Sequence, residues 1–273
     1  MPELPEVETI CKGLAPHLIG RTITRAIIRE YRLRWPILQK LPKILLQQSI
    51  IGISRRGKYI LIQMAQGTLM IHLGMSGRVR IIQPTLALQA HDHVDIILDN
   101  QTALRFTDPR RFGSIHWIDS HTDPYEHRLL INLGPEPLTT ALSGDYLWQR
   151  AQKRKTAIKA FIMDSHIVVG VGNIYANEAL FLAQIKPTRA AGDVSRTEFN
   201  TLVKMIRKVL LTAIKAGGTT LKDFVSHEGM PGYFQQKLKV YGRGGEACVV
   251  CKQPLIEIRL GQRSTVYCGR CQR

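Results

Sequence analysis

The spacing of apolar residues changes along this chain and predicts different secondary structure in each part. From Glu3 to Leu18, apolar side chains recur at helical spacing. Gly20 follows this stretch, and glycine readily adopts the left-handed conformation that ends helices. The pattern predicts an amphipathic helix that holds the N-terminus at one end of a packed element.

Residues 22 to about 118 form short apolar segments interrupted by glycine, proline, asparagine and aspartate, which is typical of β-structure. We expect strands at 22–29, 49–54, 58–63, 69–73, 79–82, 94–98, 104–107 and 114–118. Many short strands at this spacing predict an all-β sandwich or barrel.

Helical spacing returns after residues 132–138, where two prolines and a glycine indicate a domain boundary. Ser195 and Glu198 have the spacing of a helix capping box. The apolar residues from 202 to 214 then keep helical spacing until Gly217 and Gly218 end the run. We expect these apolar side chains to form core and to bind no cofactor.

The charge balance indicates a polyanionic partner. The chain has 38 lysines and arginines against 21 acidic residues, a formal net charge of +17. Such an excess favours nucleic acid first and an anionic membrane surface second. Residues 21–58 hold ten of these cations and a single acid, Glu30, which predicts a binding face. We expect a cytoplasmic protein, because no apolar run approaches the roughly 20 residues of a spanning helix and the N-terminus does not resemble a signal peptide.

The cysteines predict a metal site near the C-terminus. Two C-x-x-C pairs, separated by sixteen residues, match a tetrahedral four-thiolate zinc site formed by Cys248, Cys251, Cys268 and Cys271. Strands at 255–259 and 265–267 would form a hairpin with Arg263 at or near its tip. Because all four ligand positions are filled, we predict one structural Zn²⁺. A redox dithiol pair or two disulfides are the alternatives, and Cys11 is expected to be a buried apolar residue.

The first residues, Met1 to Glu6, carry candidate nucleophilic chemistry. Removal of Met1, which is usual before a small residue, would leave Pro2 with a free secondary amine. A terminal amine has a pKa of roughly 7.7–8.0, so a useful fraction is unprotonated near neutral pH. Glu3 and Glu6 supply carboxylates for proton transfer. The alternative is a frayed, proline-rich terminus.

Three loop motifs carry candidate nucleic-acid contacts. Met75, Arg110 and Phe112 lie on glycine-flanked loops, and such side chains can wedge open a base stack. The glycine-rich turn before Asn173 suits a phosphate, although a packing turn explains it equally well. For His91 we favour a phosphate or sugar contact over a metal, because a third ligand is missing nearby. Ordinary turn chemistry is the alternative for each loop.

Together these residues resemble bacterial formamidopyrimidine-DNA glycosylases, which repair 8-oxoguanine and ring-opened purines. The resemblance covers the whole chain. It includes the motifs at 2–6, 56–59, 72–75, 91–93, 108–113, 170–175 and 217–221 and the four cysteines. It implies an α+β multidomain fold with an N-terminal helix plus β-sandwich (1–134), a helical helix-two-turn-helix domain (135–231) and a zinc-finger β-hairpin (232–273). Damaged double-stranded DNA would lie in the cleft between domains, bound by a monomer.

The resemblance also implies a mechanism. The Pro2 nitrogen would attack C1′ of the damaged nucleotide and form a Schiff base, while Glu3 protonates the sugar ring oxygen. Lys58 matches the lysine that assists β-elimination, and Arg263 matches the residue linked to δ-elimination. The chain would then be a bifunctional DNA glycosylase and AP lyase.

The implied DNA contacts come from both halves of the chain. Met75, Arg110 and Phe112 match residues that fill the gap left by the flipped nucleotide, with Arg110 facing the orphaned cytosine. The other implied contacts are His72, His91, Arg154, Lys159 and Asn173. The family often has lysine in place of Arg154, and either residue can contact a phosphate. Residues 217 to about 233 resemble a mobile loop that closes over the damaged base.

Two alternatives stay open at this point. An endonuclease VIII-like glycosylase would prefer oxidised pyrimidines, but Leu4 and the three wedge residues favour the purine class. A non-catalytic, zinc-containing protein that binds damaged DNA would also fit the charge and the cysteines. Such a protein has no need for the Pro2–Glu3 terminus or for Lys58.

Overall fold

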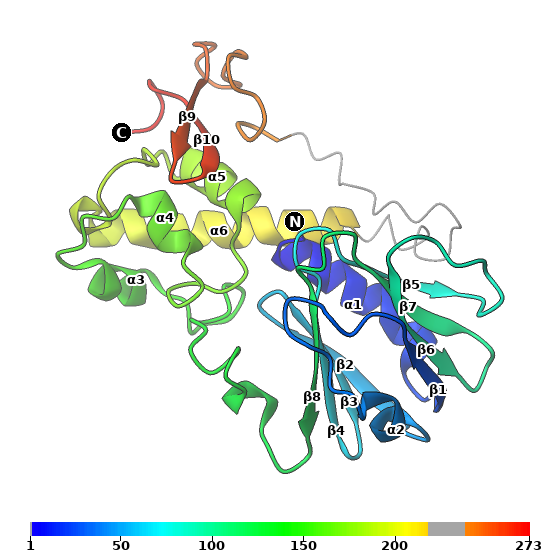
Figure 1. Cartoon of the computed structure of the whole chain (residues 1–273). Helices are drawn as coiled ribbons and strands as arrows, with labels where there is room; N and C mark the ends of the chain where they lie inside the picture. Colours follow the sequence, from blue (N-terminus) through cyan, green and yellow to red (C-terminus); the bar gives the residue numbers. More distant parts are fainter. Residues whose placement is uncertain (1, 218–237) are drawn as a thin grey trace. The chain divides into compact units, whose positions relative to one another are not determined.

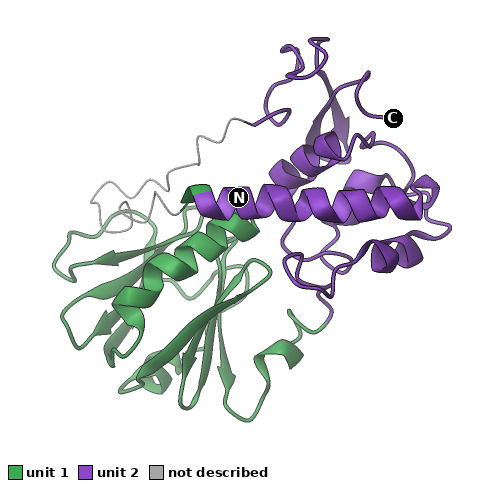
Figure 2. Ribbon diagram, turned by 180° about the vertical axis from the view of Figure 1, so that it is seen from behind, with its two compact units in different colours: residues 1–131, 216–234 green, residues 132–215, 235–273 purple. Residues whose placement is uncertain are grey.

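The computed structural model describes residues 2–217 and 238–273, which form two compact units (Figures 1 and 2). Of these residues, unit 1 contains 2–131 with 216 and 217, and unit 2 contains 132–215 and 238–273. The chain passes between units at Ile131 and Asn132, where the proline-rich segment begins. The boundary expected at residues 231 and 232 lies outside the described residues, so the three-domain division stays a prediction.

Unit 1 begins with helix α1, Leu4–Leu18, as the apolar spacing predicts. The Glu3 backbone N–H donates to Oε2 of Glu6 (2.7 Å), which satisfies one of the amides that a helix start leaves without a partner. At the other end Gly20 has a φ of +80°, as expected for a residue that ends a helix. The apolar face of α1 is buried in the unit 1 core.

Eight strands follow, and each lies within two residues of its predicted position. They are β1 Ile23–Ile28, β2 Ile50–Arg56, β3 Tyr59–Met64, β4 Gly67–His72, β5 Arg78–Ile82, β6 Asp92–Leu98, β7 Ala103–Thr107 and β8 Ser114–Asp119. They form two antiparallel sheets, in the orders β1-β6-β7-β5 and β2-β3-β4-β8. One apolar cluster contains α1 and residues of both sheets, which confirms the helix-plus-sandwich prediction.

The described part of this unit also contains a short helix that the apolar spacing does not predict. Helix α2, Leu41–Leu45, lies between β1 and β2 and buries Leu41 and Leu45 in the same core. Its length is little more than one turn, so the sequence cannot display a helical period there. A single 3₁₀ turn at Pro124–Glu126 follows β8.

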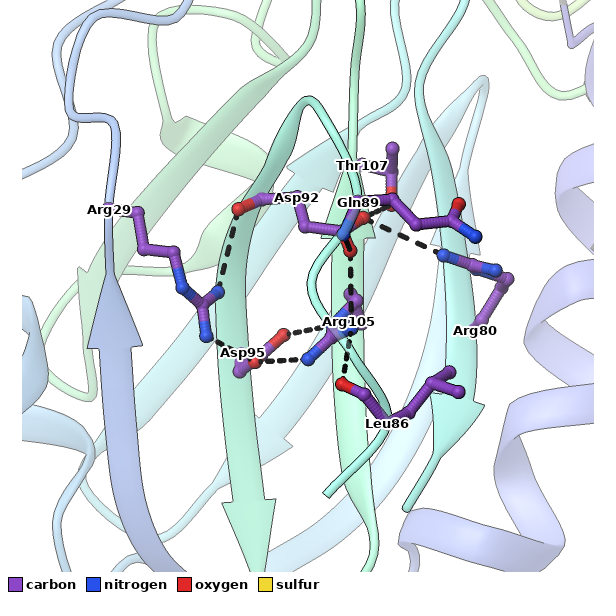
Figure 3. Close-up of polar contacts among 8 residues, drawn as sticks. All are labelled: Arg29, Arg80, Leu86, Gln89, Asp92, Asp95, Arg105 and Thr107. Carbon is purple, nitrogen blue, oxygen red and sulfur yellow. Dashed lines mark hydrogen bonds and ion pairs between the residues drawn. The ribbon is translucent and has the colours of Figure 1, made fainter. Parts of the chain in front are cut away.

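A cluster of buried charges lies on the β1-β6-β7-β5 sheet, on the face away from the apolar core (Figure 3). Arg105, only 1% exposed, donates from Nε and Nη2 to the two oxygens of Asp95 (2.7 and 2.8 Å) and from Nη1 to Oδ2 of Asp92 (3.1 Å). Arg29 also donates to Asp95 (2.6 Å), and Arg80 lies 3.6 Å from Asp92. These ion pairs cross four strands of one sheet.

The hydrogen bonds in this cluster keep Asp95 charged. Burial raises the pKa of Asp95, but the hydrogen bonds from Arg105 and Arg29 outweigh it, so the pKa lies below its ordinary value. A lowered pKa in the folded state stabilises the fold above the unfolded-state pKa of about 3.9, and this stabilisation is lost as the pH falls through the folded-state value.

We predict that Arg105→Met destabilises unit 1 by about 3–5 kcal/mol, because it leaves buried carboxylates without their main cation. The measurement is urea unfolding at neutral pH, with hydrogen exchange of β6 and β7 amides to separate unit 1 from unit 2. Arg25→Met is the matched control, since Arg25 is exposed on β1 of the same sheet. Equal stability of the two variants would contradict the prediction. As the pH falls below about 4, Arg105→Met should also lose less stability than the wild type.

Unit 2 is helical and ends in a β-hairpin. Its elements are α3 Gly144–Ala151, α4 Ile158–Met163, α5 Asn173–Leu182, a 3₁₀ turn at Ala191–Asp193, α6 Arg196–Gly217 except its last two residues, β9 Ile256–Leu260 and β10 Arg263–Tyr267. The predicted capping box starts α6, because the Ser195 N–H donates to Oε2 of Glu198 (2.8 Å) and the Glu198 N–H donates to Oγ of Ser195 (3.3 Å). The helix is described as far as Gly217, the first of the two glycines predicted to end it, and Gly218 lies outside the described residues.

The apolar face of α6 packs in the core of unit 2 with residues of α3, α4 and α5, as predicted. Among the described residues, no helix combines the length and the apolar character needed to cross a membrane.

Candidate functional site

The N-terminal residues are packed against the start of α1. Glu3 is buried, at 3% exposure, and Pro2 directly before it is half-buried. The hydrogen bond from the Glu3 backbone to Glu6 fixes the main chain at this point. From Glu3 onward the main chain is therefore held at the start of α1 rather than frayed.

Lys58 lies in the tight turn between β2 and β3. Arg56 pairs with Tyr59 across this turn, and Gly57 has the positive φ (+57°) that a two-residue hairpin turn requires. Arg55, which is largely buried, donates from Nη1 to the Gly57 carbonyl (2.9 Å).

The same Arg55 guanidinium connects this turn to α1. Its Nε donates to Oε2 of Glu8 (2.9 Å), a residue of α1. One buried cation thus ties the turn that presents Lys58 to the helix that follows Pro2. Sequence reasoning missed this role of Arg55, because no local spacing relates residue 8 to residue 55.

His72 is a neutral, oriented imidazole at the end of β4. It lies opposite Tyr59 in the β3–β4 register, with ring centroids 4.7 Å apart. Burial, together with the positive charges of Lys58 and Arg34, lowers the pKa of His72 to about 4. The Gly74 N–H donates to Nδ1 of His72 (3.0 Å), so at neutral pH the proton is on Nε2, which can donate to a ligand.

Asp108 joins the two loops that carry the predicted wedge residues. Its fully buried carboxylate accepts from Oγ of Ser76 (2.6 Å) and from the Gly113 N–H (2.7 Å). Oγ of Ser76 in turn accepts from the Arg110 N–H (3.2 Å). A Cβ on Gly74, whose φ is +61°, would lie only 2.4 Å from the backbone carbonyl carbon of Phe112. The main chains of the two loops are therefore in direct contact.

This pairing brings the three wedge candidates onto neighbouring loops. Met75 is 45% exposed and Phe112 44% exposed, so both apolar side chains are accessible to a partner. The Arg110 guanidinium stacks on the Phe112 ring, 4.6 Å from its centroid. His91 is exposed, and its carbonyl accepts from the Asp108 N–H (3.1 Å), so it is attached to the same structure.

In unit 2 the basic run at 153–155 lies on the surface. Arg154 is exposed, and its guanidinium lies 5.6 Å from the centroid of the Phe161 ring. Asn173 is the first residue of α5, and its amide donates to the Ser264 carbonyl (3.1 Å). DNA contact by Arg154 and Asn173 stays a prediction.

The structure differs from the prediction at Lys159. This side chain is 1% exposed, among the apolar residues of α4, and it does not lie on a DNA-accessible surface. Its ammonium donates to the Ser264 carbonyl (2.8 Å) and to Oγ1 of Thr265 (2.7 Å). The basic residues upstream made Lys159 look like a solvated cation, whereas the apolar residues around it in α4 indicate burial.

The four C-terminal cysteines form a metal centre. Their sulfur atoms all lie within 4.8 Å of one another, with Cys248 4.0 Å from Cys271 and Cys251 3.3 Å from Cys268. Tetrahedral zinc with Zn–S bonds of about 2.3 Å separates its ligands by about 3.7 Å, so the cluster fits Zn²⁺, whereas disulfide sulfurs lie about 2.05 Å apart. Cysteines bind zinc as thiolates, so four thiolates this close together need a cation to offset their mutual repulsion.

The hairpin held by this centre presents Arg263. Strands β9 and β10 pair with Leu260 opposite Arg263, which leaves Gly261 and Gln262 as the turn. The Arg263 side chain is exposed beside the turn, so the predicted position near the tip is confirmed.

Three family models match successive parts of the chain. The formamidopyrimidine-DNA glycosylase N-terminal domain matches residues 1–115, and the formamidopyrimidine-DNA glycosylase H2TH domain matches residues 133–225. The zinc finger found in FPG and IleRS matches residues 245–273, which include the four cysteines. The class that this combination defines is a DNA glycosylase with a helix-two-turn-helix domain and a zinc finger.

Relatives match over the full length. Proteins called formamidopyrimidine-DNA glycosylase from Pseudomonas savastanoi, Pseudomonas syringae and Hahella chejuensis are 54%, 55% and 53% identical, with all of each chain covered. A crystal structure of a Lactococcus lactis FPG mutant with Fapy-dG-containing DNA is 30% identical, with a TM-score of 0.90 over all of both chains. Another Lactococcus lactis Fpg structure, bound to AP-site DNA, is 29% identical with a TM-score of 0.88, again over all of both chains. The chain belongs to the formamidopyrimidine-DNA glycosylase family.

We predict that Cys268→Ser lowers the zinc content from one ion per chain towards zero and accelerates hydrogen exchange throughout residues 256–267. The reason is that bound zinc contributes folding free energy, which the small apolar cluster of this module cannot replace. Elemental analysis after dialysis measures the metal. Cys11→Ala is the matched control, because Cys11 is buried in unit 1 away from the cluster and should keep the zinc. Full zinc retention by Cys268→Ser would contradict the assignment.

Proposed function

We propose that this protein is a bifunctional base-excision repair enzyme that removes oxidised purines from duplex DNA and then cleaves the strand. The observation that carries the proposal is the full-length family match together with a Pro2–Glu3 terminus held at the start of α1. The known complexes of Lactococcus lactis Fpg with Fapy-dG and AP-site DNA support the same substrate class.

In this proposal the damaged nucleotide leaves the stack before any chemistry, at a cost of a few kcal/mol. Met75, Arg110 and Phe112 fill the vacated space, and Arg110, which stacks on the Phe112 ring, faces the orphaned cytosine. The pairing of their loops through Asp108 supports this role, because side chains on loops that move apart could not keep a duplex open.

The Pro2 nitrogen attacks C1′, the bond from C1′ to the base breaks, and Glu3 protonates the sugar ring oxygen as the ring opens. The resulting Schiff base makes the 2′-hydrogen acidic. Its removal, assisted by Lys58, expels the 3′ phosphate in β-elimination, and Arg263 promotes expulsion of the 5′ phosphate in δ-elimination. The Arg55 contacts to Gly57 and Glu8 support a fixed position for Lys58 relative to α1.

The proposed backbone contacts are His72, His91, Arg154 and Asn173. The net charge of +17 supplies sequence-independent affinity that falls steeply with salt. The Zn²⁺ is structural, since four protein ligands leave no open position. We infer a monomer that acts in the bacterial cytoplasm, where its DNA substrate lies.

Preference for oxidised pyrimidines is the second candidate substrate class. A Lactococcus lactis Fpg structure that is 30% identical, with a TM-score of 0.89, contains oxidised-pyrimidine DNA, so the shared fold admits such a ligand. Leu4 and the wedge set Met75, Arg110 and Phe112 favour purines here. A protein that only binds damage would have no use for a terminal amine at Pro2.

We predict that borohydride traps a covalent complex on duplexes with 8-oxoguanine opposite cytosine, strongly compared with a duplex carrying an oxidised pyrimidine. Sequencing of the crosslinked peptide should identify Pro2, because reduction captures the imine at the attacking nitrogen. A stronger crosslink on the pyrimidine duplex would show that oxidised pyrimidines are the preferred substrates. Absence of a crosslink with DNA binding intact would refute the catalytic proposal.

An N-terminal extension by one residue tests the nucleophile separately. It turns the Pro2 amine into an amide, so strand cleavage and trapping should be lost while DNA affinity stays within about twofold. Strand cleavage at the wild-type rate would rule out Pro2.

We predict that Arg263→Ala stalls the reaction after β-elimination, with base release and β-product unchanged. Gel analysis of the 3′ ends distinguishes the two products. Arg259→Ala is the matched control, since Arg259 is an exposed arginine on β9 of the same hairpin. A normal amount of δ-product from Arg263→Ala would remove Arg263 from the mechanism.

A further inference from the structure

The buried ammonium of Lys159 contacts the two residues that follow Arg263. It donates to the Ser264 carbonyl (2.8 Å) and to Oγ1 of Thr265 (2.7 Å), and Thr265 is fully buried. Oγ1 of Thr265 in turn donates to the Arg263 carbonyl (3.3 Å). Hydrogen bonds therefore run without interruption from Lys159 on α4 to the main chain of Arg263.

Helix α5 supports the same three-residue segment. The Asn173 amide donates to the Ser264 carbonyl (3.1 Å), and Oδ1 of Asn177 accepts from the Val266 N–H (2.9 Å). Residues 264–266 are thus fixed by β9 along one edge and by α4 and α5 along the other. The exposed Arg263 side chain projects from the first residue beyond this anchored segment.

Among these contacts, the Lys159 ammonium differs from the other donors because it is charged. Hydrogen bonds from a charged donor are stronger than those between neutral groups, and burial strengthens them further. Lys159 is also the donor to Oγ1 of Thr265, which leaves the hydroxyl proton of Thr265 directed at Arg263. The cation therefore sets both the position of the Ser264 carbonyl and the orientation of the Thr265 hydroxyl.

We propose that Lys159 is a positioning residue for Arg263, which fixes the main chain at the hairpin tip through Ser264 and Thr265, and that it does not contact the DNA. The inference rests on the proposed lyase function for its readout. A displacement of about 1 Å at a reacting group can slow a step by up to about 100-fold. The effect should therefore fall on δ-elimination, the step assigned to Arg263.

The decisive variant is Lys159→Met, which keeps the length and apolar stem of the side chain and removes the ammonium. On AP-site duplexes we expect δ-elimination to slow by about 10- to 100-fold, with borohydride trapping and β-elimination within about twofold of wild type. Lys204→Met is the control for the loss of one charge, because Lys204 is exposed on α6. An unchanged ratio of δ- to β-product in Lys159→Met would overturn the proposal.

Salt dependence separates positioning from DNA contact. Loss of a phosphate-binding lysine lowers the slope of log K against log salt by about 1. For Lys159→Met we expect the slope of the control variant Lys204→Met. A slope lower by about 1 than that of the control would overturn the proposal in favour of a backbone contact.

Two substitutions of Thr265 test the same link between Lys159 and Arg263. Thr265→Val removes the hydroxyl that connects Lys159 to Arg263, so it should give the same selective loss of δ-product, and the double variant should be no worse than Lys159→Met alone. Thr265→Ser keeps the hydroxyl and should retain most of the δ-product. Additive losses in the double variant would overturn the link.

Hydrogen exchange of residues 263–267 tests the positioning role of Lys159 without relying on the proposed lyase activity. With zinc content still one per chain, Lys159→Met should exchange at least about tenfold faster there than wild type or Lys204→Met. If the wild type forms no Schiff base, the lyase proposal fails, yet faster exchange would still support positioning by Lys159. Unchanged exchange would overturn it whatever the wild type does.

Discussion

The structure depends on one constraint: its proposed reactive groups lie where regular backbone hydrogen bonding ends. Pro2 precedes a helix, Lys58 lies in a hairpin turn, the wedge residues lie on loops, and Arg263 lies at a hairpin tip. Backbone N–H and C=O groups at such places need partners when they are buried, and neither a helix nor a sheet supplies them. Polar side chains supply them instead: the half-buried Glu6 and Arg55, and the buried Asp108, Asn177 and Lys159.

This arrangement separates the exposed reactive side chain from the buried one that holds it. Asp108 is buried where Phe112 is exposed, and Lys159 is buried where Arg263 is exposed. Glu178 follows the same rule, since its carboxylate accepts backbone N–H groups at residues 239–241 and fixes the chain where it enters the zinc module. Each partner that is lost leaves buried polar groups unsatisfied, so such positions tolerate substitution poorly.

Local patterns were sufficient for much of this molecule. Helix α1, all eight strands of unit 1, the capping box of α6 and the four cysteines follow from spacings of fewer than about twenty residues. The contacts that hold the site do not, because Arg55 meets Glu8 and Asn177 meets Val266 across long stretches of sequence. Lys159 was assigned to the wrong environment for the same reason: its partner in the hairpin lies more than a hundred residues away. Its position in an apolar segment of α4 was the one local indication of burial.

Cations that bind groups of this chain also change what the net charge of +17 means. Arg29, Arg105 and Lys159 neutralise or bind groups of this chain, and Arg207 donates to three carbonyls between residues 137 and 142. Arg105 and Lys159 are each only 1% exposed, so they add to the long-range field but cannot reach a phosphate and release its counterion. The affinity for DNA is therefore set by fewer cations than the composition suggests. The remainder hold the geometry of the site, so a lysine or arginine in this family has to be located in the fold before it is counted as a DNA contact.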